Sequence, residues 1–210
     1  MTAKERVRES IERLKAEYPD AICSLTYDEA WKLLVAVRLS AQCTDERVNK
    51  VTPGLFSKYP GPKALAEAEV SDIEKIVKPC GLGHTKASDI KKCMQVLLSE
   101  FDGAVPDEME KLLRLPGVGR KSANLIMGDV YGKPAIVCDT HVIRLSNRIG
   151  FVKDIREPEK LERALKKLVP PEEGNDLCHR MVLHGRKVCT ARTTPACENC
   201  CLSDICAKRI

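Results

Sequence analysis

Three groups of residues in this sequence have types and spacings that could do chemistry. Lys121 follows the glycine-rich stretch Gly117-Val118-Gly119-Arg120, where its amine could bind phosphate as a compact point charge or act as a nucleophile. Asp139 stands eighteen positions later, where a carboxylate could assist catalysis or simply cap a helix. Five cysteines crowd into the last 22 residues, which indicates a metal or cluster site rather than a disulfide framework.

The elements that must position Lys121 are two short helices joined by a hairpin. Apolar residues at helical spacing stand before the hairpin and after it: Met109, Leu112 and Leu113, then Ala123, Ile126, Met127 and Val130. Pro116 ends the first helix because proline has no N–H to donate and disfavours the α conformation in its predecessor. The second helix begins with N–H donors and a partial positive charge, which together attract phosphate. The pattern therefore predicts a clamp on a DNA backbone.

Length and composition leave the class of protein open but exclude some partners. The chain has 210 residues, a formal charge of +5 and 4% aromatic residues. This charge is compatible with nucleic acid but too small to argue for it alone, and scarce aromatics disfavour recognition by stacking of single-stranded bases. No apolar run approaches the ~20 residues that a membrane span needs. The segment from Met1 to Asp20 is typical of an amphipathic helix and not of a signal peptide, so we expect a cytoplasmic protein with no membrane partner.

Two further loops carry side chains that have ordinary structural explanations. Gln42 lies between two helical stretches and would by chemistry alone be an exposed amide, with Thr44 as N-cap of the helix that follows. Leu82 lies between two glycines and could staple the next helix. That helix carries an apolar stripe with Lys86, Lys91 and Lys92 off the stripe, so we expect these lysines to be outside the core.

The C-terminal cysteines read Cys189-x7-Cys197-x2-Cys200-Cys201-x4-Cys206. Four thiolates at this spacing suit structural zinc or a four-iron four-sulfur cluster, and spacing alone does not separate the two. Cys201 is the substitute ligand if Cys200 does not bind. His179 and His184 are expected to be surface or packing residues. The other six cysteines stand among apolar residues and are expected to be buried thiols: Cys23, Cys43, Cys80, Cys93, Cys138 and Cys178.

The motifs together resemble those of the endonuclease III family of DNA glycosylases. Leu115–Ala123 (LPGVGRKSA) is similar to the family's helix-hairpin-helix, and Leu39–Asp45 (LSAQCTD) to its LSAQATD segment. The stretch VCDTHV around Asp139 is similar to the family's VDTHV, and GLGHTKA to its Gly-Leu-Tyr loop, with Gly83 in place of the tyrosine. The cysteines follow the family's C-x6-C-x2-C-x5-C pattern with one extra residue after Cys189.

The resemblance implies an all-α fold of two domains. These are a six-helix domain over 21–133 that contains the hairpin, and a helical domain of 1–20 and 134–210 with a 4Fe-4S cluster loop. It implies Lys121 and Asp139 as catalytic residues in the cleft between the domains. The implied cluster ligands are Cys189, Cys197, Cys200 and Cys206. The implied DNA contacts are Gln42, Leu82, Gly117, Val118, Gly119, Arg120, His141 and Arg192.

The implied activity is that of a bifunctional glycosylase/AP lyase of base excision repair. Lys121 would excise an oxidised pyrimidine from duplex DNA through a Schiff base, and β-elimination would cut the strand. We expect a monomer, nucleoid-associated if the source is prokaryotic. The adenine-glycosylase branch shares fold and cluster but lacks a lysine at this position. A non-catalytic hairpin DNA-binding protein, or a cluster protein that senses redox state, remains the alternative class.

Overall fold

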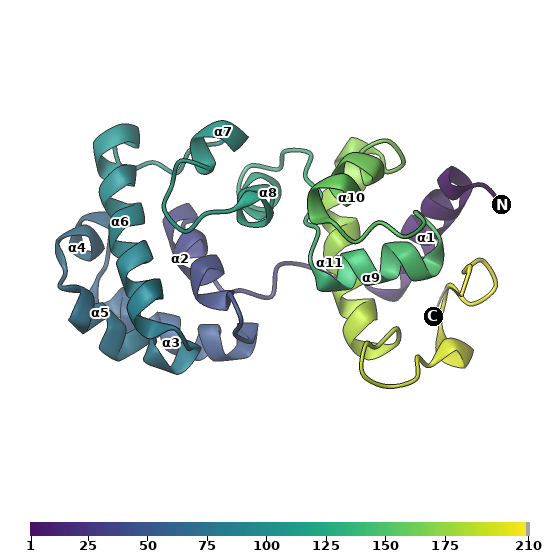
Figure 1. Cartoon of the computed structure of the whole chain (residues 1–210), viewed down its shortest axis with the longest axis horizontal. Helices are drawn as coiled ribbons and strands as arrows, with labels where there is room; N and C mark the ends of the chain where they lie inside the picture. Colours follow the sequence, from purple (N-terminus) through teal and green to yellow (C-terminus); the bar gives the residue numbers. More distant parts are fainter. Residues whose placement is uncertain (209–210) are drawn as a thin grey trace. The chain divides into compact units, whose positions relative to one another are not determined.

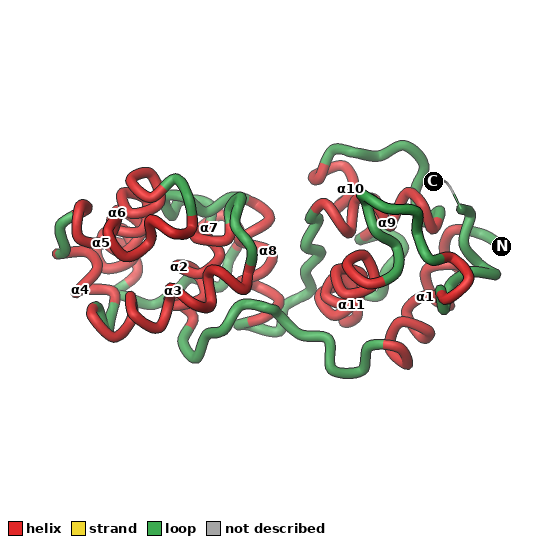
Figure 2. The backbone as a smooth tube through the Cα atoms, turned by 90° about the horizontal axis from the view of Figure 1, so that it is seen from below, coloured by secondary structure: helices red, strands yellow, loops and turns green. Residues whose placement is uncertain are grey.

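The computed structural model describes residues 1–208, which fold into two compact units of helices and loops (Figure 1). One unit is Ser24–Tyr131. The other combines Met1–Cys23 with Gly132–Ile210, of which the final two residues lie outside the described part. Figure 2 shows helix and loop only, with no strand between residues 1 and 208. The predicted all-α class is confirmed.

The unit Ser24–Tyr131 is built around its longest helix, α6. Its helices are α2 (Ala30–Ser40), α3 (Asp45–Lys58), α4 (Pro62–Glu67), α5 (Val70–Val77), the 3-10 turn η1 (Lys78–Cys80), α6 (Gly83–Phe101), α7 (Met109–Leu112) and α8 (Arg120–Asp129). Helices α2, α4 and α5 pack against α6, and α8 packs against α2 and α7. Helix α2 is apolar on most sides and is correspondingly buried from Trp31 to Leu39, except at Lys32 and Arg38. The Thr44 side chain accepts a hydrogen bond from Arg47 N, so the predicted N-cap is confirmed.

The second unit is centred on α11. Its elements are α1 (Ala3–Glu17), α9 (Thr140–Ile149), α10 (Pro158–Leu165), the turn η2 (Pro171–Glu173), α11 (Gly174–Lys187) and the turn η3 (Cys197–Asn199). Helices α1 and α9 both pack against α11. Gly185 allows the close approach of α9, because a Cβ there would lie 2.7 Å from His141 Nδ1.

Some expectations from the pattern are wrong. Lys86, placed outside the core because it falls off the apolar stripe of α6, is completely buried. Leu113, counted among the apolar positions of the first hairpin helix, is 42% exposed because α7 ends one residue earlier. Cys23 and Cys43 are half-buried, whereas Cys80, Cys93, Cys138 and Cys178 are buried as expected.

No helix among residues 1–208 combines the length and apolarity that crossing a bilayer requires.

Candidate active site and cysteine pocket

The hairpin between α7 and α8 is fixed by a close backbone contact. Gly117 has φ of +78°, and a Cβ at this residue would lie 2.8 Å from Arg38 Cδ and 3.2 Å from Asp89 Cβ. Arg38 Nε donates to Asp89 Oδ2 at 2.8 Å, so the hairpin rests on an ion pair that joins α2 to α6. Only glycine fits here without strain, since it alone adopts this φ freely and fills no space.

Lys121 lies in the first turn of α8 and is exposed. Gly119 is the N-cap in extended conformation, and none of the described side chains caps this helix. The first-turn N–H groups of Arg120 and Lys121 lie at the positive end of the helix, next to the hairpin. The arrangement can therefore bind a phosphate and hold an amine beside it.

Gln42 and Leu82 both occupy unusual backbone conformations at exposed positions. Their φ values are 55° and 49°, in the left-handed region that costs a non-glycine residue about 1–2 kcal/mol. Gln42 precedes α3, and Leu82 is the N-cap residue of α6 and is 57% exposed. Conformations of this kind persist where the surrounding structure holds them, and they gather at functional sites.

Asp139 is the N-cap of α9 in the second unit. Its Oδ1 accepts a hydrogen bond from Val142 N at 2.8 Å, as the capping prediction requires. The preceding residues Ala135–Cys138 are at most 7% exposed, so Cys138 points inward as expected and the half-buried Asp139 ends a buried segment. Val137 N donates to Cys178 Sγ of α11, which fixes this segment to the helix behind it. One carboxylate oxygen is therefore held in a defined rotamer.

Helix α9 also carries His141 and two arginines that bind the cysteine segment. Arg144 donates to His141 Nδ1 at 3.1 Å and to the carbonyl oxygens of Gly185 and Cys189 at 2.9 Å each. One turn later, Arg148 donates to Thr190 O at 2.7 Å. Sequence reasoning missed these arginines, although a pair four residues apart on one helix face is a recognisable pattern.

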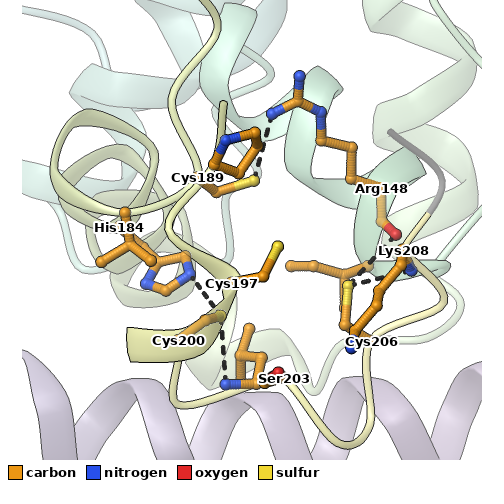
Figure 3. A pocket seen from close by; sticks show the side chains of 12 residues that line it. Arg148, His184, Cys189, Cys197, Cys200, Ser203, Cys206 and Lys208 are labelled. Atoms are coloured by element: carbon orange, nitrogen blue, oxygen red, sulfur yellow. Dashed lines mark hydrogen bonds between the residues drawn. The ribbon is translucent and has the colours of Figure 1, made fainter. Parts of the chain in front are cut away.

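The pocket in Figure 3 is lined by four cysteines of the C-terminal segment: Cys189, Cys197, Cys200 and Cys206. Cys201 is not among its lining residues, and all eleven cysteines are free thiols. The loop between Cys189 and Cys197 is closed at its base by Ala196 N, which donates to Val188 O at 3.1 Å. The extra residue of this interval therefore falls within an exposed loop, which also carries the exposed Arg192.

Hydrogen-bond donors point at three of the four sulfur atoms. Arg148 Nη1 donates to Cys189 Sγ at 3.4 Å, Leu202 N to Cys200 Sγ at 3.4 Å and Lys208 N to Cys206 Sγ at 3.3 Å. Such donors stabilise thiolates over thiols. Burial raises the pKa of Cys200 and of Cys206, and the N–H donors act against that rise.

His184 is a packing residue that also touches the pocket. Its ring is 1% exposed and lies edge-on to Tyr18, whose hydroxyl is 3.1 Å from Nδ1. Nε2 is 3.3 Å from Cys200 Sγ, so with Tyr18 donating to Nδ1 the other nitrogen donates to the sulfur. Burial lowers the pKa of His184, which favours this neutral ring.

The cysteine segment is also held by α1. Arg6 donates to Ile205 O at 2.7 Å and Arg13 to Cys201 O at 3.0 Å. No set of three or more His, Cys, Asp or Glu side chains within residues 1–208 is arranged to hold a metal ion. The chemistry of the donor set nevertheless fits a thiolate-bound group, because four free thiols line one pocket and backbone and guanidinium donors face their sulfur atoms.

Comparison with known proteins decides the family. A family model described as HhH-GPD superfamily base excision DNA repair protein matches residues 35–171. The endonuclease III of Synechocystis sp. is 46% identical to this chain, and the match covers 97% of this chain and 92% of that protein. The chain belongs to the endonuclease III family. The Escherichia coli (strain K12) endonuclease III is 39% identical, over 94% of this chain and 93% of that protein.

Solved structures agree with this assignment. A non-covalent endonuclease III–DNA complex and a trapped endonuclease III–DNA covalent intermediate each match with a TM-score of 0.93 and 39% identity, covering 99% of this chain and 97% of the other. A thermostable thymine-DNA glycosylase shares the fold, with a TM-score of 0.88 at 22% identity. The predicted family is confirmed, and with it the reaction class: the chain is a DNA glycosylase and AP lyase of base excision repair.

Proposed function

We propose that this endonuclease III family member removes oxidised or ring-saturated pyrimidines, such as thymine glycol, from double-stranded DNA, with Lys121 as its nucleophile. The observation that carries the proposal is the exposed Lys121 amine in the first turn of α8, directly after a hairpin shaped for phosphate. A phosphate held at this helix start would bring the sugar of the same strand to the amine.

The chemistry follows from a neutral amine. Lys121 Nζ forms a bond to C1′ of the extruded nucleotide while the bond from C1′ to the base breaks, and the base leaves with a proton. Opening of the sugar ring gives a protonated imine. Loss of a proton from C2′ then expels the 3′ phosphate oxygen and cuts the strand. Water hydrolyses the imine and restores the lysine.

Asp139 is the proposed partner of Lys121. A carboxylate can stabilise the positive charge that develops on the sugar as the base leaves, or take the proton that the amine must lose. Its N-cap hydrogen bond to Val142 N supports this role, because a fixed rotamer costs no reorganisation during the reaction. In the proposed domain division, a domain over 21–133 supplies Lys121 and a domain of 1–20 and 134–210 supplies Asp139.

The remaining proposed contacts bind the duplex. Gln42 enters the space that the extruded nucleotide leaves and pairs with the widowed base, and Leu82 wedges between base steps. The backbone of Gly117, Val118, Gly119 and Arg120 binds phosphate, and His141 and Arg192 add contacts from the second unit. The protein acts as a monomer on duplex DNA with an oxidised pyrimidine or an abasic site, in the cytoplasm at the nucleoid.

We further propose that Cys189, Cys197, Cys200 and Cys206 hold a 4Fe-4S cluster. When bound, the cluster cross-links the C-terminal segment through its thiolate ligands and supports DNA binding without redox turnover. The test is iron, acid-labile sulfide and zinc content of protein purified without air. Cys200→Ser should lose the cluster, and Cys201→Ser is the matched control. Zinc in place of iron, or equal loss in both variants, would overturn the assignment.

Borohydride trapping tests the nucleophile. Native protein on duplex DNA with a single thymine glycol should give a covalent adduct, and Lys121→Gln should bind the same DNA without one. Lys63→Gln is the matched control, because Lys63 is 79% exposed on α4 and outside the proposed site. An adduct with Lys121→Gln would remove Lys121 from its role. Binding by native protein without an adduct, on abasic DNA as well, would favour the non-catalytic alternative.

A further inference from the structure

Lys86 is a buried lysine that the proposed chemistry does not use. It lies in the first turn of α6 and is completely buried. A positive charge is unfavourable at this position for two reasons. Burial removes the hydration of the ammonium group, and the start of a helix carries a partial positive charge. Burial accordingly lowers the pKa of Lys86. A lysine kept there needs a compensating role.

The partners of Lys86 show what it connects. Its Nζ donates to Leu39 O and to Cys80 O, at 2.8 Å in each case. Leu39 stands three residues before Gln42, and Cys80 stands two residues before Leu82. One ammonium group thus joins the base of the Gln42 loop to the base of the Leu82 loop.

These two loops share a second property. Gln42 and Leu82 are exposed non-glycine residues at positive φ, with values of 55° and 49°. A chain segment held in this region relaxes unless something anchors it. Each loop is anchored to the same nitrogen atom, so its position relative to the other loop is set by a side chain and not by helix packing alone.

The hairpin rests on the same framework. Arg38, one residue before Leu39, forms an ion pair with Asp89, which lies one turn after Lys86 on α6. Gly117 of the hairpin packs against both members of that pair. The two loops and the phosphate-binding hairpin are therefore supported by the same part of the unit, where the end of α2 packs against the start of α6.

We propose that Lys86 is a positioning residue for base extrusion, which holds the Gln42 and Leu82 loops at the spacing that lets both enter the duplex at one lesion. The inference rests on the proposed function, in which these two side chains enter DNA. Lys86 touches neither DNA nor the reacting atoms. Its loss should impair extrusion and leave chemistry on an already accessible sugar intact.

Lys86→Met tests this, because methionine fills similar space and removes the ammonium. Single-turnover excision at saturating protein, on duplex thymine glycol paired with adenine, should fall at least about tenfold, or about 1.4 kcal/mol in barrier height. Cleavage of an abasic site in single-stranded DNA needs no extrusion and should stay within about twofold of native, or about 0.4 kcal/mol. A 2-aminopurine base beside the lesion reports unstacking by its fluorescence. In Lys86→Met this fluorescence change should be lost together with the excision activity.

Gln95→Met is the matched control. Gln95 Nε2 on the same helix donates to Ala66 O of α4, an equivalent side-chain link between elements away from both loops. Gln95→Met should change neither reaction. Lys86→Arg keeps a cation with donors for both carbonyls, so its excision rate on duplex should lie between those of Met and native. If Lys86→Met does not fold, Lys86→Arg decides alone: its duplex excision should fall more than its cleavage of the single-stranded abasic site, and an equal fall in both reactions would overturn the proposal.

The outcomes separate cleanly. Equal loss in the two reactions would mean that Lys86 only stabilises the unit, and native rates in both would mean that the loops need no such anchor. Lys86→Arg no better than Lys86→Met would also overturn the proposal. Failure of the native protein to excise would refute the proposed function itself, and it is visible before any variant is compared.

Discussion

The contact between Gly117 and the pair of Arg38 and Asp89 predicts a measurable cost for one added methyl group. In Gly117→Ala, alanine at φ of +78° costs about 1–2 kcal/mol. The new Cβ would also lie 2.8 Å from Arg38 Cδ, so the guanidinium must move away from Asp89. That ion pair is partly exposed, with side chains 18% and 26% accessible, and its disturbance adds up to about 1 kcal/mol.

The total of about 1–3 kcal/mol corresponds to a fall in Tm of about 2–12 °C for a chain of this length. Thermal unfolding followed by circular dichroism measures it, and hydrogen exchange at α8 locates the loss if the two units unfold separately. Affinity for undamaged duplex at fixed salt should fall as well, because the displaced hairpin loses its fit to phosphate.

Gly54→Ala is the control with the opposite sign. Gly54 lies inside α3 with open space around its Cα, and alanine is favoured over glycine in a helix interior by about 0.5–1 kcal/mol. Its Tm should rise by about 1–4 °C. A Gly117→Ala protein that melts within about 1 °C of native would refute the reasoning, since neither the backbone term nor the contact would then be present.

Three further predictions follow from other parts of the molecule. Asp139→Asn should keep the N-cap hydrogen bond and the native Tm, because asparagine caps a helix as well as aspartate does. Its rate of single-turnover excision should fall about a hundredfold. An unchanged rate would show that the carboxylate takes no part in the reaction. Arg148→Met removes a donor to Cys189 Sγ, so protein purified without air should contain less iron per chain by metal analysis, and equal iron would show that the sulfur needs no such donor. Burial raises the pKa of Cys93 and Cys138 to about 12, so unfolded chains lose thiol protons first and stability should fall as pH rises above about 9. The free energy of unfolding, measured by urea titration at several pH values, should fall less steeply with pH for Cys93→Ala than for the native protein. An equal dependence on pH would contradict this origin.

The local sequence was sufficient to predict the all-α class and several local features of both units. Asp139 was predictable as an N-cap because capping depends on neighbours within one turn. Cys138 was predictable as a buried thiol because the residues before it are apolar. Thr44 is a third case of the same kind. Each of these features is decided by short-range chemistry that a single sequence contains.

Lys86 shows where such reasoning fails. Its place off the apolar stripe of α6 predicted an exposed lysine, yet two carbonyl oxygens from other elements accept its hydrogen bonds. Those acceptors are backbone atoms, and any residue types at Leu39 and Cys80 would supply them. The side-chain pattern therefore carries no signal of the partner. The arginines of α9 that bind Cys189 differ in part: their spacing is visible in the sequence, but their main acceptors are also carbonyl oxygens, so the sequence does not indicate what they bind.

The attachment of α9 to the cysteine segment bears on how the protein is made. Arg144 and Arg148 are half-buried, and the acceptors Cys189 O, Cys189 Sγ and Thr190 O come late in the chain. A growing polypeptide that has not yet been synthesised as far as Cys189 carries Arg144 and Arg148 on helix α9 without those acceptors. During synthesis, helix α9 therefore gains these hydrogen-bond partners only after the chain has grown past Thr190.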